Sequence, residues 1–436
     1  MNINLPESFL KEMQDILKDE YEDYLKSFDD NSYTALRLNR LKIDKETFKR
    51  LFNLDLEEVT WTDNGFYIDK NDSFSKSPFY KAGLYYLQEP SAMTPASFMP
   101  INDGDMVLDL CAAPGGKSTE LLAKLNNTGV LFANDISFSR CAALLSNLEK
   151  FGGRNYFVMS EDSNKLAKHF NQYFDKILID APCSGEGMFR KDHHLIDSFI
   201  ERGPEYYASI QKRLILDAAK MLKEGGMILY STCTFSSLED EEIIKYLLEN
   251  EEDFEVVQLP LIDGFIDTGY GMKLFPHRIK GEGHFVSLLR KKGTLKANPK
   301  RKPFIYETDD LKMVFDGGSL SQIKDKLYYI PDTDLNLAHI RFLRTGLLLG
   351  EYKRNRLEID PLLALTLKDN EFKQIIDYQR DDPSLNTYFK GGTLSNNSNY
   401  KKGLVLLRCE GYPIGFGKID GPIIKNKYPK GWITCA

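Results

Sequence analysis

Short apolar strand patterns alternate with helix patterns between residues 105 and 291. The strand patterns are MVLDL (106–110), GVLFAND (129–135), NYFVMS (155–160), DKILIDAP (175–182) and MILYSTC (227–233). The helix patterns between them cover residues 117–125, 139–151, 205–223 and 238–250. This alternation predicts an α/β domain with a mainly parallel sheet and helices on both faces. One more strand pattern, HFVSLLRK (284–291), is expected at the edge of the sheet.

Different patterns precede this region. Residues 5–28 place apolar side chains near helical spacing, which predicts one or two helices. Residues 35–43 (ALRLNRLKI) alternate apolar and polar side chains, as a half-buried strand does. We therefore expect a small N-terminal module of helices and strands at residues 1–75, followed by the α/β domain at residues 76–291.

A basic segment follows the α/β domain. RKKGTLKANPKRK (290–302) contains seven basic residues among 13, which is typical of a linker or of an arm that contacts phosphates. We place this linker at residues 292–303. Residues 304–436 contain short strand patterns and Gly/Pro turns, which predict one or two small β-rich or mixed units.

Charge is distributed unevenly along the chain. Residues 1–290 contain 32 Lys and Arg against 47 Asp and Glu, a net charge of −15, whereas residues 291–436 contain 25 against 17, a net charge of +8. A basic region is the expected electrostatic feature of a protein that binds a nucleic-acid backbone. A solvated linker combined with chance explains the same numbers, so charge alone does not choose between the two.

Several classes of protein are disfavoured by what the sequence lacks. It has no apolar run of the roughly 18 residues that a transmembrane helix needs, and its N-terminus does not have the pattern of a signal peptide. Its six cysteines form no CxxC pair, and neither they nor the six histidines have metal-ligand spacing. We therefore expect a cytoplasmic protein with reduced thiols, no metal site and no membrane partner.

A glycine-rich loop follows the first strand of the α/β domain. In LDLCAAPGGKST (108–119), Gly115 and Gly116 allow close approach to the backbone, and the helix that starts near Lys117 presents free N–H groups. The loop is not a P-loop, because Cys111 stands where the P-loop has its first glycine and Pro114 lies inside it. GxGxxG is also absent, which disfavours a dinucleotide. The alternative is a glycine-rich turn without a ligand.

Acidic residues stand at the ends of the next strands. Asp135 follows the second strand, Asp162 follows the third, and Asp180 ends the fourth. A single Asp at such a position is often only a helix cap. Together, however, the three stand where the ribose hydroxyls and the exocyclic amine of a nucleoside could be bound. Glu161 is a possible substitute for Asp162.

Two cysteines lie at the ends of adjacent predicted strands: Cys183 in IDAPCSGEGMFRK and Cys233 in LYSTCTFSS. Buried cysteines are common in protein cores, so the pair alone favours a structural role. Both, however, have small loop residues around them, and Asp180 precedes Cys183 by three positions. A thiolate in such a cleft can attack an electron-poor ring carbon. The cations that could lower a thiol pKa there are Lys117, Arg190 and Lys191.

CAAPGGKS, DAPCSGEG and STCTF, in this order, resemble the motifs of the Sun-type (NOL/NOP/Sun) family of RNA 5-cytosine methyltransferases. QEPSA (88–92) and GHFVSLLRK (283–291) resemble the family's flanking motifs, so the resemblance covers residues 80–291. ALRLNRLK (35–42) resembles the family's N-terminal RNA-binding module. The C-terminal third, with HIRFLRTGLLLGEYKRNRLEIDPLLAL and GYPIGFGK, looks like the tail of the RsmF (YebU-like) group, which methylates small-subunit ribosomal RNA.

The resemblance implies a fold and partners. The α/β domain would be a Rossmann-like class I methyltransferase with a mainly parallel seven-stranded sheet that binds S-adenosylmethionine. Residues 1–75 would form an RNA-binding α+β module, and residues 304–436 an RNA-binding, PUA-like region. The product would be 5-methylcytosine in 16S rRNA. We expect a monomer whose partner is ribosomal RNA or the small ribosomal subunit.

The resemblance also implies roles for single residues. Cys233 would add to carbon 6 of cytosine, and Cys183 would assist release of the product. Asp180 would bind the cytosine edge and stabilise protonation of the ring, which we expect to require surroundings that raise its pKa. The methionine part of the cofactor would be held by Cys111, Ala112, Ala113, Pro114, Gly115, Gly116 and Lys117. Asp135 would hold the ribose hydroxyls and Asp162 the adenine amine, and Asp180 is also expected to border the cofactor.

Three alternatives are kept beside this interpretation. DNA cytosine methyltransferases use the cysteine of the proline-cysteine motif as nucleophile, which would exchange the roles of Cys183 and Cys233. The same chemistry could act on tRNA. The chain could also be an RNA-binding ribosome-assembly factor without catalysis, although such a binder has no chemical need for Cys183, Cys233 and Asp180.

Overall fold

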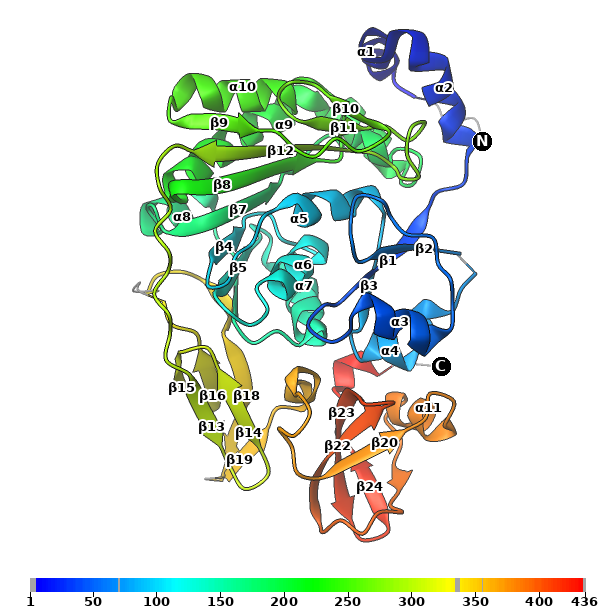
Figure 1. Cartoon of the computed structure of the whole chain (residues 1–436), viewed down its shortest axis with the longest axis vertical. Helices are drawn as coiled ribbons and strands as arrows, with labels where there is room; N and C mark the ends of the chain where they lie inside the picture. The colour runs from blue at the N-terminus through cyan, green and yellow to red at the C-terminus, as the bar shows by residue number, and fades with distance from the viewer. Residues whose placement is uncertain (1–4, 70, 334–337, 355, 434–436) are drawn as a thin grey trace.

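A sheet of ten strands forms the centre of the molecule, in the order β10-β11-β12-β8-β7-β4-β5-β6-β17 with β9 paired to β12 (Figure 1). The computed structural model describes residues 5–69, 71–333, 338–354 and 356–433. Five neighbouring strands are parallel: β4 (Met106–Asp109), β5 (Val130–Asn134), β6 (Tyr156–Met159), β7 (Phe174–Asp180) and β8 (Leu222–Thr232). The antiparallel additions are β9 (Phe254–Val257), β10 (Phe265–Asp267), β11 (Met272–Leu274), β12 (His284–Lys291) and β17 (Phe342–Thr345).

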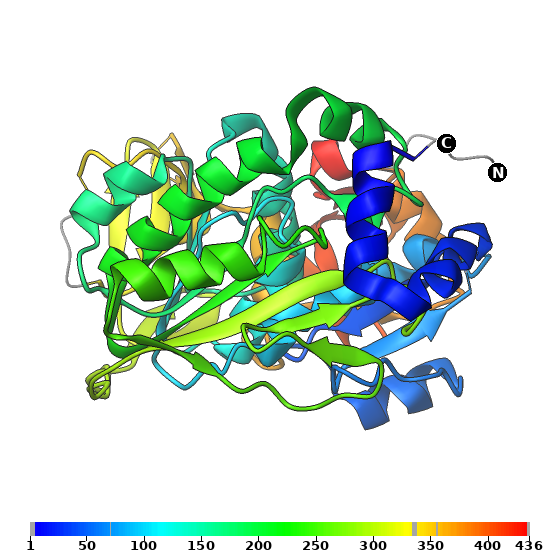
Figure 2. The same ribbon diagram turned by 90° about the horizontal axis from the view of Figure 1, so that it is seen from above.

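Helices cover both faces of this sheet. One face carries α8 (Ser163–His169), α9 (His194–Met221) and α10 (Glu241–Asn250), and Figure 2 shows α9 and α10 side by side. The other face carries α5 (Thr94–Phe98), α6 (Gly116–Lys124) and α7 (Phe138–Phe151). Every residue of β4, β5 and β6 is buried, as expected for parallel strands between two helical layers.

The α/β class is confirmed, but the sheet has ten strands rather than seven. The β10–β11 hairpin and β9 extend it beyond β12. At the opposite edge β17, which comes from the C-terminal region, pairs with β6. The helix expected at residues 205–223 begins earlier, at His194, and is interrupted at Gly203, whose φ of 69° is not helical.

The N-terminal region forms two separate parts rather than one module. The helices α1 (Glu7–Leu17) and α2 (Tyr21–Lys26) leave the small sheet and pack on the α/β domain (Figure 1). The shared apolar cluster contains Phe9, Met13, Tyr24, Phe189, Phe199, Phe235 and Phe275. Because Phe189 and Phe235 lie in the segments after β7 and β8, these helices cover the loops that carry the two motif cysteines.

The second part is a three-stranded sheet. Its strands are β1 (Thr34–Leu38), β2 (Gly65–Ile68) and β3 (Tyr85–Gln88), and its helices are α3 (Lys45–Phe52) and α4 (Pro78–Lys81). The sheet extends beyond residue 75, because β3 pairs with β1. The strand expected at residues 35–43 ends at Leu38, because Asn39 forms a turn in which its Oδ1 accepts from Leu41 N at 3.1 Å.

The C-terminal region contains two β-rich units. The first has β13 (Phe304–Glu307), β14 (Lys312–Phe315), β15 (Ser319–Ile323), β16 (Lys326–Ile330), β18 (Leu347–Lys353) and β19 (Arg356–Ile359). The second has β20 (Ile375–Tyr378), β21 (Leu394–Ser395), β22 (Gly403–Cys409), β23 (Tyr412–Asp420), β24 (Ile423–Asn426) and α11 (Pro383–Phe389). This second unit shares a core with the small N-terminal sheet that includes Phe79, Leu385 and Val405, and the ring centroids of Phe79 and Tyr412 lie 6.1 Å apart.

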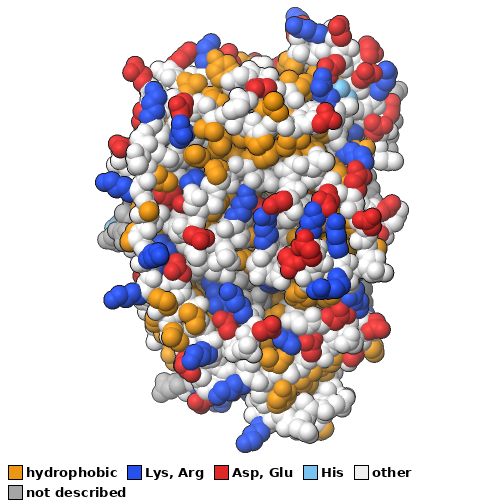
Figure 3. Space-filling view, in the orientation of Figure 1, with side chains coloured by type: hydrophobic (Ala, Val, Ile, Leu, Met, Phe, Trp, Pro, Cys, Tyr) orange, Lys and Arg blue, Asp and Glu red, His pale blue; other side chains and the backbone are white. Residues whose placement is uncertain are grey.

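The basic segment 292–303 contains no helix or strand. Asn298 ties it to the α/β domain, because its Nδ2 donates to Asp175 Oδ2 at 2.8 Å and to Gly104 O at 3.1 Å. Charged side chains of both signs are interspersed over the face shown in Figure 3, including its lower half, where the C-terminal units lie. The positive net charge of residues 291–436 is therefore not gathered into one basic patch on this face.

Candidate active site

The predicted motifs meet at the carboxyl edge of the parallel strands. The chain runs from β4 outward to β5 and β6, and then returns to the other side of β4 as β7 and β8. The strand order thus reverses between β4 and β7, and in an open α/β sheet such a point is where ligands bind. The loops after β4, β7 and β8 carry the glycine-rich motif and the two cysteines.

The glycine-rich loop after β4 is held by its neighbours. Gly115 has a φ of 110°, which favours glycine, and α6 starts at the next residue. The loop contacts are Ala112 N to Asn134 O at 2.7 Å, Arg140 to Ala113 O at 2.6 Å and Asn147 to Pro114 O at 2.9 Å. Burial raises the pKa of the Cys111 thiol well above its usual value, so this cysteine is not an activated nucleophile.

Asp109, at the end of β4, is a site residue to which the sequence assigned no role. It is fully buried and accepts a hydrogen bond from Ser118 Oγ at 2.6 Å. Burial raises the pKa of Asp109 to about 7. Its Oδ1 has no hydrogen-bond partner within the described structure, so an unsatisfied buried acceptor lies at the start of the loop that the motif predicts to bind a ligand.

Asp135 lies immediately after β5 and faces the same loop. Its carboxylate accepts from Ser137 N at 2.9 Å and from Ala113 N at 3.3 Å, and Arg140 lies 3.4 Å away. The two apolar residues beside it are unusually exposed: Ile136 by 65% and Phe138 by 50%. An anchored carboxylate next to exposed apolar side chains is a suitable surface for the polar ribose and the flat base of a nucleoside.

Asp162 and Glu161 have different surroundings. Asp162 caps α8, because its Oδ1 accepts from Asn164 N at 3.0 Å. Glu161 is buried and accepts from the backbone N–H of Arg341, just before β17, at 2.7 Å. Asp162 therefore has the helix-capping role that an Asp at the end of a strand often has. The C-terminal region contacts this end of the site through Glu161.

Cys183 and Cys233 lie side by side, with their Sγ atoms 3.3 Å apart and both side chains half-buried. Their loops are joined by further contacts, Ser184 Oγ with Thr234 Oγ1 at 2.8 Å and Gly187 N with Cys233 O at 2.9 Å. The hydrogen bond with Cys233, together with burial, raises the pKa of the Cys183 thiol well above its usual value. The structure thus brings both predicted cysteines into one site.

The nearby cations do not activate Cys183. Lys117 pairs with Asp180, and Arg190 pairs with Glu282, with Nε and Oε2 2.7 Å apart, while Lys191 is exposed. The expectation that one of these cations lowers the pKa of that thiol is therefore wrong for Cys183, because each cation has another partner or faces solvent.

Asp180, at the end of β7, links the glycine-rich loop to the cysteines. Lys117 Nζ lies 2.6 Å from its Oδ2, Ser231 Oγ donates to Oδ1 at 2.9 Å, and His284 Nε2 lies 3.6 Å from Oδ1. Burial acts to raise the pKa of Asp180, but Lys117 and His284 outweigh it and hold that pKa well below its usual range. The expectation of a raised pKa at Asp180 is wrong, because the sequence could not show these two partners.

Three buried carboxyl groups support the cysteine loops. Glu239 accepts from Ser184 N at 3.0 Å, Glu186 accepts from Phe235 N at 2.9 Å, and Asp240 accepts from Thr232 Oγ1 at 2.6 Å. Burial raises the pKa of Glu239 to about 7 and that of Glu186 to about 8, and it raises the pKa of Asp240 well above its usual value. No role was predicted for these groups or for His284 and Ser231, although Glu186, Ser231 and His284 lie within the motifs DAPCSGEG, STCTF and GHFVSLLRK.

Neither a metal cluster nor a membrane-spanning helix is found in the described structure. Among residues 5–69, 71–333, 338–354 and 356–433, no group of three or more His, Cys, Asp or Glu side chains could hold a metal ion. Within the same ranges no helix is long and apolar enough to cross a membrane.

Four family models match successive parts of the chain. The model of the 16S rRNA methyltransferase RsmB/F matches residues 96–290, and that of the N-terminal domain of the 16S rRNA methyltransferase RsmF matches residues 5–90. The first C-terminal domain of the RsmF rRNA methyltransferase matches residues 304–367, and the RsmF PUA domain matches residues 376–434. These last two matches coincide with the two β-rich units of the C-terminal region.

Curated proteins are similar over almost the whole chain. Ribosomal RNA small subunit methyltransferase F of Vibrio vulnificus (strain YJ016) is 31% identical over 465 residues, and the match covers 98% of each chain. The protein of the same name from Photobacterium profundum is 30% identical, over 98% of this chain and 96% of that one.

Solved structures match about two thirds of the chain. A methyltransferase homologue protein from Pyrococcus horikoshii is 27% identical, with a TM-score of 0.58 over 66% of this chain and 96% of that chain. NSun6 from Pyrococcus horikoshii, solved with SFG, has a TM-score of 0.58 over 67% of this chain and all of that chain (100%). At 20% identity this second likeness concerns the fold alone.

Proposed function

The chain belongs to the RsmF family of small-subunit ribosomal RNA methyltransferases, which depend on S-adenosylmethionine, and we propose that it methylates carbon 5 of a cytosine in 16S rRNA through a covalent cysteine adduct. The family, the fold class and the enzyme class expected from the sequence are confirmed. The observation that carries the finer proposal is the pair of thiols, 3.3 Å apart, in the loops that follow Asp180 at the end of β7 and Thr232 at the end of β8.

The paired thiols fit the chemical need of the reaction. Carbon 5 of cytosine is a poor nucleophile, and addition of the Cys233 sulfur at carbon 6 makes it an enamine carbon that can accept a methyl group. Removal of the carbon-5 proton then returns its electron pair to the ring as the carbon–sulfur bond breaks. We assign to Cys183 the part of assisting this elimination, which its position against Cys233 allows.

The residues at the carboxyl edge fit S-adenosylmethionine, which supplies the electrophilic methyl group when bound. Three observations support the fit: the open turn at Gly115, the unpartnered Oδ1 of Asp109 and the exposed Ile136 beside Asp135. We propose that Cys111, Ala112, Ala113, Pro114, Gly115, Gly116 and Lys117 border the methionine part. Asp135 would hold the ribose hydroxyls, and Asp162 or Glu161 the adenine amine.

Asp180 would act as an ionised carboxylate. Its lowered pKa keeps it charged across the physiological range. A carboxylate at this position accepts hydrogen bonds from the amine edge of cytosine and stabilises the positive charge of the ring as it takes up a proton. The role expected from the sequence is therefore kept, with an anion in place of a neutral acid.

We propose 16S rRNA or the small ribosomal subunit as the substrate, bound by a monomer in the cytoplasm. The PUA domain and the full-length similarity to small-subunit methyltransferases support this choice over tRNA. RNA binding by the N-terminal region and by the basic segment 292–303 is part of the proposal. The target cytosine would have to be unstacked to reach the cysteines.

Methyl transfer from labelled S-adenosylmethionine tests the proposal. The substrates are unmodified small subunits, naked 16S rRNA and tRNA, and mass spectrometry identifies the product nucleoside. We expect 5-methylcytosine in the rRNA or in the subunits. Labelling of tRNA alone would overturn the substrate, and a different methylated nucleoside would overturn the chemistry. Binding of rRNA without transfer to any substrate would favour an idle assembly factor.

A further inference from the structure

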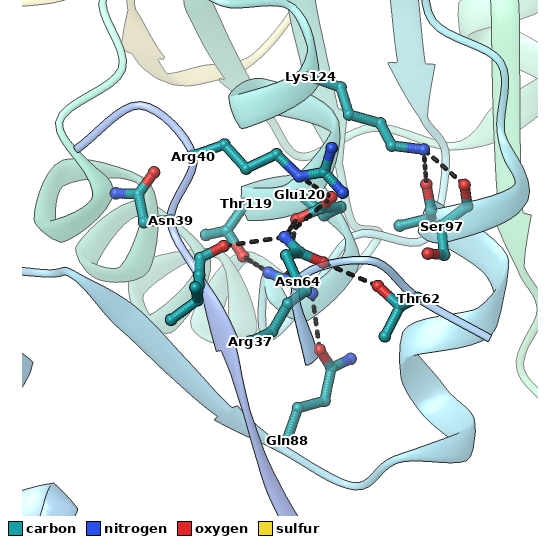
Figure 4. Close-up of polar contacts among 12 residues, drawn as sticks. Arg37, Asn39, Arg40, Thr62, Asn64, Gln88, Ser97, Thr119, Glu120 and Lys124 are labelled. Carbon is teal, nitrogen blue, oxygen red and sulfur yellow. Dashed lines mark hydrogen bonds and ion pairs between the residues drawn. The ribbon is translucent and has the colours of Figure 1, made fainter. Parts of the chain in front are cut away.

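A buried polar network joins the small N-terminal sheet to the start of α6 (Figure 4). We call Arg37, Gln88, Thr119 and Glu120 the α6 clamp. Arg37 lies on β1, the central strand of its sheet, and is only 1% exposed; Glu120 is also 1% exposed. Charged side chains are rarely buried to this extent unless they are paired, so the contacts of Arg37 define what it does.

The guanidinium of Arg37 contacts the first turn of α6 at three points. Nη1 donates to Gly116 O at 2.7 Å, Nη2 donates to Thr119 Oγ1 at 2.7 Å, and Nε lies 3.0 Å from Glu120 Oε2. The planar fork of an arginine fixes the direction of such contacts as well as their distance. The turn is therefore held from outside its own domain.

Gln88, at the end of β3, holds the arginine and lies close to the same turn. Arg37 Nη1 donates to its Oε1 at 2.6 Å, while its Nε2 donates to Ala92 O at 3.0 Å. A Cβ atom at Gly116 would lie 3.1 Å from that Nε2, so the absence of a side chain at residue 116 gives room for the Gln88 side chain against the turn. The clamp thus acts directly on the glycine-rich turn.

The residue after Gly116 is Lys117, whose Nζ lies 2.6 Å from Asp180 Oδ2. The position of this backbone turn determines where the free N–H groups of α6 lie. It also determines where the Lys117 side chain leaves the backbone. A displacement of about 1 Å at such a point can cost about 10²-fold in rate. Arg37 therefore contacts Gly116, the residue before Lys117, and the ion pair of Lys117 joins the proposed cofactor loop to Asp180.

Other polar side chains of ALRLNRLK also point inward. Asn39 Nδ2 donates to Phe151 O at 2.9 Å, and Lys42 Nζ donates to Lys150 O at 2.9 Å, both at the end of α7. The side chain of Arg40, in the same segment, is 34% exposed. The segment that resembles an RNA-binding motif is thus directed mainly at α6 and α7.

We propose that Arg37 is a positioning residue for the cofactor-binding turn of α6 and not an RNA contact. Through Gly116, Thr119 and Glu120 it holds the turn in the form that receives S-adenosylmethionine. This inference rests on the proposed function, because it assigns that cofactor to the turn.

The experiment uses the full-length protein and three variants. Arg37→Lys keeps the charge but cannot make the forked contacts, and Thr119→Val removes one acceptor with almost no change in volume. Arg40→Lys is the matched control, because Arg40 Nε lies 3.6 Å from the same Glu120 but no bond joins Arg40 to the α6 backbone. The readouts are the dissociation constants of S-adenosylmethionine and of 16S rRNA, KM for each, melting temperature, and amide hydrogen exchange of residues 116–120 without ligand.

We expect Arg37→Lys to weaken S-adenosylmethionine binding by roughly tenfold or more, and Thr119→Val to weaken it less. Both variants should raise the exchange rate of residues 116–120, leave the affinity for rRNA unchanged, and raise KM for the cofactor alone. Arg40→Lys should match the wild type. A loss of rRNA affinity with intact cofactor binding would overturn the inference. So would a lower melting temperature without any change in cofactor binding or exchange. Failure of the wild type itself to bind S-adenosylmethionine would instead overturn the proposed function, so the two failures are distinguishable.

Discussion

The Sγ atoms of Cys183 and Cys233 lie 3.3 Å apart, although 50 positions separate the two residues along the chain. Their loops follow β7 and β8, which are parallel neighbours, so the sheet itself brings the loops together. Glu239 and Glu186 then accept from the loop backbone at Ser184 N and Phe235 N, and Asp240 accepts from the Thr232 hydroxyl. Two thiols at this distance allow one to bond to the substrate while the other remains close to the same carbon atom.

The two cysteines should give opposite results when each is replaced. If Cys233 is the nucleophile, Cys183→Ala should accumulate a covalent protein–RNA adduct, because elimination is slowed, while Cys233→Ala should form none. Methyl transfer should fall by at least about 10²-fold in both variants. Denaturing gels with labelled rRNA detect the adduct. An adduct in Cys233→Ala and none in Cys183→Ala would show that the roles are reversed.

Oxidation should join the two thiols. A disulfide bond has an S–S length of about 2.05 Å, so only a small movement is needed. Diamide takes up the two protons and two electrons that the thiols lose, and we expect methyl transfer to be abolished and then restored by dithiothreitol. Peptide mapping should find the 183–233 disulfide. Inactivation of the wild type without a 183–233 disulfide in the peptide map would point to a different cysteine.

Replacing Lys117 should move the acid limb of the pH–activity profile upward. In the proposed mechanism Asp180 acts as an anion, and Lys117 contributes to its lowered pKa. In Lys117→Met at saturating cofactor, the pKa of Asp180 rises, so activity is lost at a higher pH than in the wild type as the medium is acidified. Asp180→Asn should lower kcat by about 10²- to 10⁴-fold at every pH. An unchanged acid limb in Lys117→Met would contradict the pairing.

Stability should decrease with rising pH because of Glu186. Burial raises its pKa from 4.5 to about 8 in the folded chain, so the folded state binds the proton more tightly. The resulting stabilisation is fully present below pH 4.5 and is lost as the pH rises through about 8. Glu186→Gln should therefore gain about 2–4 °C in melting temperature relative to the wild type between pH 5 and pH 9. Glu249→Gln, at an exposed position, is the control; an equal gain there would contradict the assignment.

The basic segment should contribute to RNA affinity in a salt-dependent way. Lys296, Lys300 and Lys302 are exposed. Replacing all three by Gln should weaken rRNA binding and reduce the slope of log affinity against log salt by about 2–3, because each phosphate contact contributes about 0.7–0.9. Cofactor affinity should not change. Filter binding at several salt concentrations measures both; an unaltered slope would exclude phosphate contacts by these lysines.

Local patterns predicted much of the fold and the position of the site. The strands β4 to β8 were expected because each is a short apolar run, and the loops that follow them were expected because the motifs are contiguous in sequence. The five parallel strands alone place Cys183 near Cys233. Each strand and each motif lies within one contiguous segment, so the sequence shows it directly, and the alternation of strands and helices then predicts that the strands are parallel neighbours.

Features that depend on packing between distant segments were not predicted. Arg37 stands at a polar position of the alternating pattern, where an exposed side chain is expected. In the structure α6 covers this side of β1, while Leu36 and Leu38 join the apolar cluster on the other side. The lowered pKa of Asp180 depends on Lys117 and His284, which come from α6 and β12. No periodicity within one segment carries information about these partners.

The pairing of β17 with β6 has a consequence for how the chain is made. The outermost parallel strand, Tyr156–Met159, has its backbone groups on one side paired by residues that are synthesised much later, Phe342–Thr345. Until these emerge from the translating ribosome, the catalytic sheet has an open flank that can pair with other chains. A fragment cut at residue 303 would keep every cysteine and carboxylate of the site and still behave as an unfinished, aggregation-prone protein. The sheet of the methyltransferase domain therefore reaches its final form only when the C-terminal region that contains β17 has been translated.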